Sequence, residues 1–255
     1  MSNNNLDKLA ELRWPDDFID KVVCGDCLEV MQDIPALSID VIITDPPFFT
    51  PAVHYQSRTS WGRCWADMSI LGQFFFDIAK EFKRILKREG HLFIFCHDES
   101  YPVFYPVIFG QYKYSKALIW DKEIFGLGNI FRHKFEIILW AHNKSAIFYN
   151  DGKPHSDILS YRPTPPKQRQ HPVEKPVDLI IELLSLTTKR NDVVLDAFLG
   201  SGTTAIACKK LRRRFIGIDM NPEYCKIAEH RLAQTACQSE LAITFHELGH
   251  EVEEK

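Results

Sequence analysis

Two apolar, β-branched runs, each followed directly by a stiff or glycine-rich loop, constrain the fold of this chain most strongly. Residues 41–43 precede Asp45-Pro46-Pro47-Phe48, and residues 193–195 precede the string DAFLGSGTT at residues 196–204. Runs of this kind are typical of buried parallel strands, and open α/β sheets bind ligands at the carboxyl ends of such strands. We therefore expect both loops at one functional edge of a sheet.

The rest of the chain alternates between apolar runs and stretches with helical spacing. Strands are predicted at residues 21–24, 39–44, 91–96, 117–120, 136–141, 193–195 and 215–218, and helices at residues 28–34, 73–87, 176–187, 203–211 and 221–234. Gly90 is interpreted as the stop signal of the second helix, and Asn221 as the N-cap of the last. The alternation predicts an α/β, Rossmann-like fold with a doubly wound, mostly parallel sheet.

We interpret residues 1–255 as a single domain. Residues 49–67 and 142–175 interrupt the alternation, and both are predicted to be irregular. The second segment is rich in proline and in basic side chains, so we interpret it as a surface insert. Long loops of this kind usually carry function.

Composition limits the classes of partner and the compartment. The formal net charge is −3, so any contact with nucleic acid must come from a local basic face. The seven cysteines are an odd number, and Cys24 and Cys27 form the one CxxC pair, which favours free thiols over disulfides or zinc. No secretory pattern and no membrane-spanning run is visible, so we expect a cytoplasmic protein without membrane association.

The glycine loop has the chemistry of a nucleoside site. Gly200 and Gly202 allow a ligand to approach the backbone closely, and Asp196 can accept a hydrogen bond from an amino group. Asp219 follows the predicted strand at 215–218, where an acidic residue can bind ribose hydroxyls. The loop contains no basic residue and no phosphate-binding pattern. A cofactor with a ribose but no phosphate fits best, and S-adenosylmethionine is such a molecule.

The first loop has the chemistry of a site for a planar amine. The exocyclic nitrogen of adenine or cytosine is a poor nucleophile because its lone pair is delocalised into the ring. The Asp45 carboxylate and the Pro46 carbonyl can each accept one N–H bond and so direct that lone pair. The prolines stiffen the loop, and Phe48 can stack on a base that has been flipped out of a duplex.

The two loops, in this order, resemble the β group of amino DNA methyltransferases, in which the catalytic segment precedes the cofactor loop. Further strings fit that family: Gly25-Asp26-Cys27, Leu86-Lys87-Arg88-Glu89-Gly90, Trp120-Asp121-Lys122, FRHKFE at residues 131–136 and HPVEKP at residues 171–176. The resemblance extends over about residues 21–233. It implies S-adenosylmethionine as the cofactor and double-stranded DNA as the substrate.

The resemblance also implies roles for individual residues. The target base would be held by Asp45, Pro46, Pro47 and Phe48. The cofactor would be bound by Asp26, His171, Lys175, Asp196, Phe198, Gly200, Ser201, Gly202, Thr203 and Asp219, although Asp26 has the alternative role of a helix cap. Phe48 stands where the family usually has tyrosine, and Ala197 where it tends to have proline. An initial Asp favours adenine N6, because cytosine N4 enzymes more often have Ser there.

DNA contacts are expected from the two irregular segments. Residues 142–170 stand where the family keeps its target-recognition region. The candidate basic residues are Arg58, Arg63, Lys144, Arg162, Lys167 and Arg169, each of which has a solvated surface charge as its alternative. The family resemblance admits a homodimer and a cognate restriction endonuclease as partners. We expect no metal ion.

Other function classes compete with this interpretation. Cytosine N4 methylation is the close alternative, and methylation of RNA or of protein glutamine is more distant, because those enzymes usually place the cofactor loop first. A binding protein with a retained fold and lost catalysis is disfavoured, since both loops are complete. The string His246-Glu247-Leu248-Gly249-His250 matches a zinc protease pattern, but an ordinary polar tail is the preferred interpretation.

Overall fold

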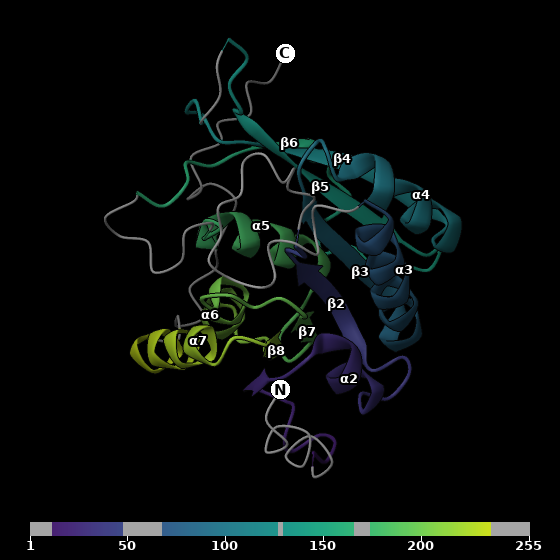
Figure 1. Ribbon diagram of the computed structural model, residues 1–255, viewed down its shortest axis with the longest axis vertical. Coiled ribbons are helices and arrows are strands. Elements are labelled where there is room, and N and C mark those ends of the chain that lie inside the picture. Colours follow the sequence, from purple (N-terminus) through teal and green to yellow (C-terminus); the bar gives the residue numbers. More distant parts are fainter. Residues whose placement is uncertain (1–11, 48–67, 127–129, 166–173, 236–255) are drawn as a thin grey trace.

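The computed structural model describes residues 12–47, 68–126, 130–165 and 174–235 as one α/β unit (Figure 1). Its strands are β1 (Lys21–Cys24), β2 (Ile39–Thr44), β3 (Leu86–Cys96), β4 (Tyr114–Asp121), β5 (Phe135–His142), β6 (Ile158–Ser160), β7 (Val193–Asp196) and β8 (Arg214–Asp219). Its helices are α2 (Cys27–Gln32), α3 (Met68–Ile85), α4 (Tyr101–Gln111), α5 (Val177–Thr187), α6 (Thr203–Lys210) and α7 (Pro222–Gln234).

All eight described strands form one sheet in the order β1-β8-β7-β2-β3-β5-β4-β6. Only β5 runs against its neighbours β3 and β4, and the other neighbouring pairs are parallel. The predicted doubly wound, mostly parallel sheet is confirmed. Among the described helices, none is both long and apolar enough to cross a bilayer.

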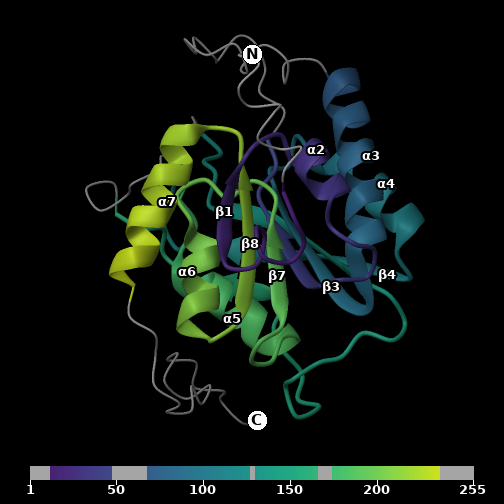
Figure 2. The same ribbon diagram turned by 90° about the horizontal axis from the view of Figure 1, so that it is seen from below.

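Helices cover both faces of the sheet, as Figure 2 shows. Helices α2, α3 and α4 pack on one face, and α5, α6 and α7 on the other. The side chains of β2 contribute to both cores: Ile39 and Ile42 join the first, and Val41 and Ile43 the second. A strand that is buried on both sides needs an apolar residue at nearly every position, which explains the continuous apolar run.

The register of β2 and β7 brings the two loops together. Val41 is paired with Val194 and Ile42 with Leu195, so the parallel strands end at the same edge of the sheet. The chain therefore leaves Thr44 and Asp196 at neighbouring positions, although 152 residues separate them in the sequence.

The structure corrects the role predicted for Gly90. The helix predicted at residues 73–87 is α3, which ends at Ile85, and Gly90 lies inside β3. A Cβ at this position would come within 2.5 Å of the Asp40 carbonyl oxygen. The glycine is therefore needed for the close passage of β2 and does not end the helix.

Two elements escaped the sequence analysis. Helix α4 carries Pro102 and Pro106 among mostly apolar residues, so it lacks the polar face that reveals a surface helix. Strand β6 is three residues long and pairs with β4 at the sheet edge. It lies within the segment 142–175, so the prediction that this whole segment is irregular was wrong.

The packing of α4 on α3 provides a test of the first core. Phe104 on α4 is fully buried, and its ring stacks on that of Phe75 with centroids 3.8 Å apart. We expect Phe104→Ala to lower the free energy of unfolding by about 3–5 kcal/mol, because it leaves a large cavity. Phe109→Ala on the same helix is the control, since that ring is 63% exposed. Equal urea midpoints for the two variants would contradict this account of the core.

Candidate active site

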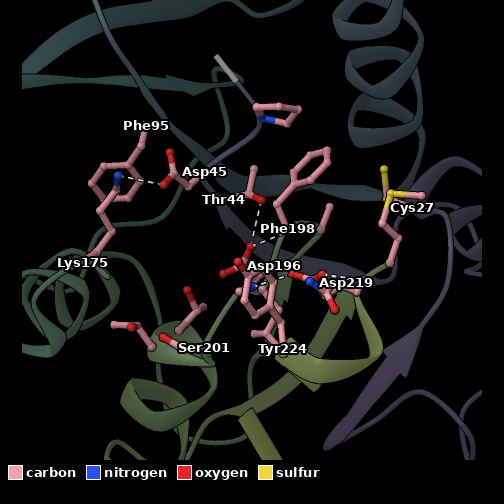
Figure 3. Close-up of a pocket in the computed structure, with 18 of the residues that line it drawn as sticks. Cys27, Thr44, Asp45, Phe95, Lys175, Asp196, Phe198, Ser201, Asp219 and Tyr224 are labelled. Atoms are coloured by element: carbon pink, nitrogen blue, oxygen red, sulfur yellow. Dashed lines mark hydrogen bonds and ion pairs between the residues drawn. The ribbon is translucent and has the colours of Figure 1, made fainter. Parts of the chain in front are cut away.

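A cavity of about 780 Å³ opens at the edge where β2 and β7 end. The predicted site residues that line it are Asp26, Asp45, Pro47, Lys175, Asp196, Phe198, Gly200, Ser201, Thr203 and Asp219. Figure 3 shows how Asp45, Asp196 and Asp219 follow one another along its wall. The structure thus brings together residues that the sequence places in five separate segments.

The glycine loop is held tightly between β7 and α6. The Leu199 amide donates to the Ile218 carbonyl at 2.8 Å, and the Gly200 amide donates to Asp219 Oδ2 at 2.8 Å. Gly202 has φ of +89°, and a Cβ there would approach the Cβ of Ala228 to 2.9 Å. Only glycine combines this backbone conformation with this close approach. Gly202 therefore shapes the loop without lining the cavity itself.

Asp219 and Asp26 each combine a structural contact with a place on the cavity wall. Besides the Gly200 amide, the Asp219 carboxylate accepts from the Asn221 amide at 2.8 Å. Asp26 caps α2 by accepting from the Leu28 amide at 2.8 Å. A carboxylate has about four acceptor positions, so neither contact prevents a bond to a ligand hydroxyl or amine. Asp26 can therefore cap α2 and bind a ligand at the same time.

Asp196 joins the two loops. Its Oδ1 accepts from the Thr44 hydroxyl at 2.8 Å and from the Phe198 amide at 3.1 Å. Burial raises the pKa of Asp196 to about 6, and hydrogen bonds from Thr204, Thr44 and Phe198 oppose that shift. The carboxylate that was predicted to accept a ligand amine thus also fixes the end of β2 to the glycine loop.

Asp45 takes part in a chain of buried charges. Lys175 Nζ lies 2.7 Å from Asp45 Oδ2 and 2.9 Å from Glu136 Oε2, and Lys122 Nζ lies 2.7 Å from Glu136 Oε1. The Lys175 ammonium also lies over the Phe95 ring, 5.2 Å from its centroid. Asp45 Oδ1 is buried, and no hydrogen bond to it comes from the described residues. One oxygen of Asp45 is therefore held in place, and the other has no hydrogen-bond partner among the described residues.

Burial and charge together set the protonation of this chain of groups. Burial raises the pKa of Asp45 to about 6, although Lys175 opposes the shift. Burial would also raise the pKa of Glu136, but Lys175 and Lys122 outweigh it and hold it at about 2. Burial would lower the pKa of Lys175, yet the two carboxylates raise it. At neutral pH Asp45 and Glu136 are therefore carboxylates, and Lys175 between them is an ammonium group.

The sequence analysis assigned Lys175 to the cofactor and did not identify Glu136. In the structure, Lys175 contacts Asp45 and Glu136, and its role toward the cofactor stays a prediction. The signal for Glu136 was available, since it is an acidic residue at the start of an apolar run, within the string FRHKFE. A second missed contact joins Glu174 to Arg231 at 2.9 Å, below the glycine loop.

The other predicted residues lie outside the described part of the chain or do not line the cavity. Phe48, Arg58, Arg63, Lys167, Arg169 and His171 lie outside the described residues, as does the string at residues 246–250. Lys144 is exposed away from the cavity lining. Arg162 is also exposed and pairs with Glu123 at 3.2 Å. Pro46 is buried behind the lining residues. The roles given to these residues stay predictions.

Comparison with known proteins agrees with this geometry. The chain matches the DNA methylase family over residues 39–230. It is 30% identical to the type II methyltransferase M.HinfI of Haemophilus influenzae, over 86% of this chain and 69% of that protein. It is 26% identical to the DNA adenine methyltransferase YhdJ of Escherichia coli, over 83% and 82% of the two chains.

A solved structure supports the same assignment. The M1.HpyAVI–SAM complex is 27% identical to this chain and superposes with a TM-score of 0.64, over 83% of this chain and 98% of the other. Sequence and fold thus agree over most of the molecule, from the Asp45 loop to the glycine loop. The chain belongs to the family of N6-adenine and N4-cytosine DNA methyltransferases.

Proposed function

We propose that this enzyme transfers a methyl group from S-adenosylmethionine to the N6 amine of adenine in double-stranded DNA. The observation that carries the proposal is that Asp45 lines the same cavity as the glycine loop, with an Oδ1 that has no hydrogen-bond partner among the described residues. A relative with 26% identity is named a DNA adenine methyltransferase, which favours adenine over cytosine. An Asp at the first position of the catalytic loop favours the same base.

The cavity fits a nucleoside cofactor that carries no phosphate. Asp26, Asp196 and Asp219 give its wall acidic acceptors for hydroxyl and amino groups, and Lys175 is already paired with two carboxylates. Phe198 adds an apolar surface against which a ring can pack. When bound, S-adenosylmethionine supplies an electrophilic methyl group on a sulfonium.

Asp45 would orient the amine and stabilise its positive charge. A carboxylate oxygen without a partner can accept an N–H bond from the amine and so turn the nitrogen toward a tetrahedral geometry. Positive charge develops on the nitrogen as it forms a new bond, and the fixed negative charge of Asp45 favours that charge distribution. Lys175 would act as a positioning residue, because it holds the other oxygen of the same carboxylate.

Base flipping is part of the proposal. The reactive amine of a paired base lies inside the duplex, whereas Asp45 Oδ1 is buried in the cavity. The target base therefore has to leave the stack to reach it. We place Phe48 against the flipped base and the recognition of DNA sequence in the segment 142–170. A homodimer and a cognate endonuclease remain proposed partners on the family resemblance alone.

The direct test is transfer of labelled methyl from S-adenosylmethionine to unmodified genomic DNA, followed by nucleoside analysis. We expect label in N6-methyladenine. Label in N4-methylcytosine would support the proposed catalytic site but contradict adenine as the target base. Bound cofactor without label in DNA would contradict the proposal and lead to RNA and protein substrates.

Asp45→Ala separates catalysis from cofactor binding. We expect the variant to lower the rate of methyl transfer by about 10²-fold or more, because it removes a fixed charge beside the reacting nitrogen. Cofactor affinity, measured by calorimetry, should change little, since Lys175 keeps Glu136 as a partner. Asp157→Ala is the control, because that carboxylate is exposed and pairs with Lys116. Equal loss of binding and transfer would contradict the role given to Asp45.

The pH dependence of single-turnover transfer tests the charge of Asp45. A protonated carboxyl no longer offers a negative charge to the amine, so the rate should fall as the pH drops through about 6, the pKa of Asp45. Lys175→Met removes the cation that lowers this pKa, so the acidic limb should move to higher pH. Lys116→Met is the matched control, and Lys175→Arg should keep the limb near its original position. An unmoved limb in a folded Lys175→Met protein would overturn the positioning role.

A further inference from the structure

The hairpin between β4 and β5 carries the most exposed large apolar side chains of the described residues. Phe131 is 95% exposed, Ile130 is 85% exposed and Phe125 is 67% exposed. These three residues are called the hairpin tip below. Contiguous exposed apolar residues are a feature of interaction surfaces, and Ile130 and Phe131 are neighbours in the chain.

The hairpin tip lies at the edge of the sheet that carries the active site. Strand β5 starts at this edge, and its second residue, Glu136, is paired with Trp120 in the ladder. Glu136 contacts Lys175, which in turn contacts Asp45. The ring of His133 in the hairpin lies 6.2 Å from that of His97, which follows the carboxyl end of β3. A partner seated on the tip would therefore lie at the same edge of the sheet as Asp45.

Backbone hydrogen bonds hold the hairpin in shape without using the apolar side chains. Lys122 donates to the Lys134 carbonyl at 2.8 Å, and Gly126 donates to the His133 carbonyl at 2.6 Å. A Cβ at Gly126 would come within 2.6 Å of that same carbonyl oxygen, so the position requires glycine. Arg132 donates to the Gly126 carbonyl at 2.8 Å. These bonds join the described parts of the two arms of the hairpin and leave the side chains of Phe131 and Ile130 exposed.

One cation beside the tip suits a phosphate of a polyanionic partner, although the exposed Asp98 lies near His133. Lys134 pairs with Asp121, and Lys122 pairs with Glu136. Arg132 has no carboxylate partner among the described side chains, and its guanidinium lies 5.9 Å from the centroid of the Phe125 ring. Arg132, which has no carboxylate partner among the described side chains, therefore stands beside Phe125, an arrangement that suits a phosphate next to an exposed base step.

We propose that Phe131 and Ile130 form a wedge that enters the base stack of duplex DNA when the target base leaves it. This inference rests on the proposed function, because it assigns a second contact to the same substrate. Apolar side chains that insert between base steps are a general means of unstacking DNA, and removal of one base leaves an apolar gap for them to fill. Arg132 would contact a phosphate beside that gap.

A second copy of this chain is a poorer partner for the tip. A buried aromatic side chain contributes about 150–250 Å². Stable interfaces bury about 800 Å² on each partner, which is more than the three side chains of a hairpin tip can supply. A single base step, by contrast, has the dimensions of one or two such side chains.

The first measurement compares Phe131→Ala with Phe109→Ala on sheared, unmodified genomic DNA. Both rings are exposed, and Phe109 lies on α4, outside the active site. We expect Phe131→Ala to lower the rate at saturating DNA by about ten-fold or more, and Phe109→Ala to leave it within about two-fold. Phe131→Trp should restore most of the rate, because its ring can also stack. A wild-type enzyme without any transfer to DNA would contradict the proposed function, whereas equal rates in all variants would contradict only the wedge.

A second readout does not depend on activity. With duplex DNA of the same source added, the additional indole of Phe131→Trp should be quenched by stacking, and that of Phe109→Trp should not. Equal responses at the two positions would overturn the wedge. Sedimentation of the wild type and of Phe131→Ala tests whether a second copy of the chain binds the tip. A dimer that Phe131→Ala dissociates would assign the tip to a protein interface and contradict its assignment to DNA.

Discussion

The contact between Lys175 and Asp45 is the interaction on which the active site depends. It joins a residue just after β2 to one just before α5, and it keeps a carboxylate charged in a cavity where burial alone would favour its neutral form. Breaking one partner of a buried pair generally costs about 3–5 kcal/mol, because a charge is left without compensation. Glu136 pairs with both Lys175 and Lys122, so two acidic side chains are matched by two basic side chains at this edge of the sheet.

The same edge is fixed from the other side by Asp196. Its bond to Thr44 ties the end of β2 to the glycine loop, and Asp219 holds that loop from β8 through the Gly200 amide. Carboxylates at three neighbouring strand ends thus serve the backbone and the cavity together. This explains how strands that are far apart in the sequence can form one site for a cofactor and an amine. The position of the hairpin tip follows from the same sheet, because β5 runs antiparallel and starts where β2 ends.

The outcome of the sequence analysis differs between kinds of element. Elements with a strong period or continuous apolar burial, such as β2, β7 and α5, were predicted at the right place and with the right type. Helix α4 was missed because its prolines and its uniformly apolar sequence hide the helical period, and β6 because three residues at an edge leave almost no pattern. Gly90 was assigned to a helix end although the constraint on it comes from the Asp40 carbonyl on another strand, a contact that local sequence does not contain.

The sequence by itself determined the order of the two loops, the chemical character of each and the family to which the chain belongs, because these depend on residue types within short strings. Only the tertiary structure decided which charged side chains form ion pairs. Lys175 and Glu136 stand 39 positions apart, as their numbers show, and their pairing depends on β5 and the residue before α5 meeting at one edge. It also decided that Phe131 stands exposed above the site, because whether an apolar residue is buried depends on what the rest of the chain brings to it.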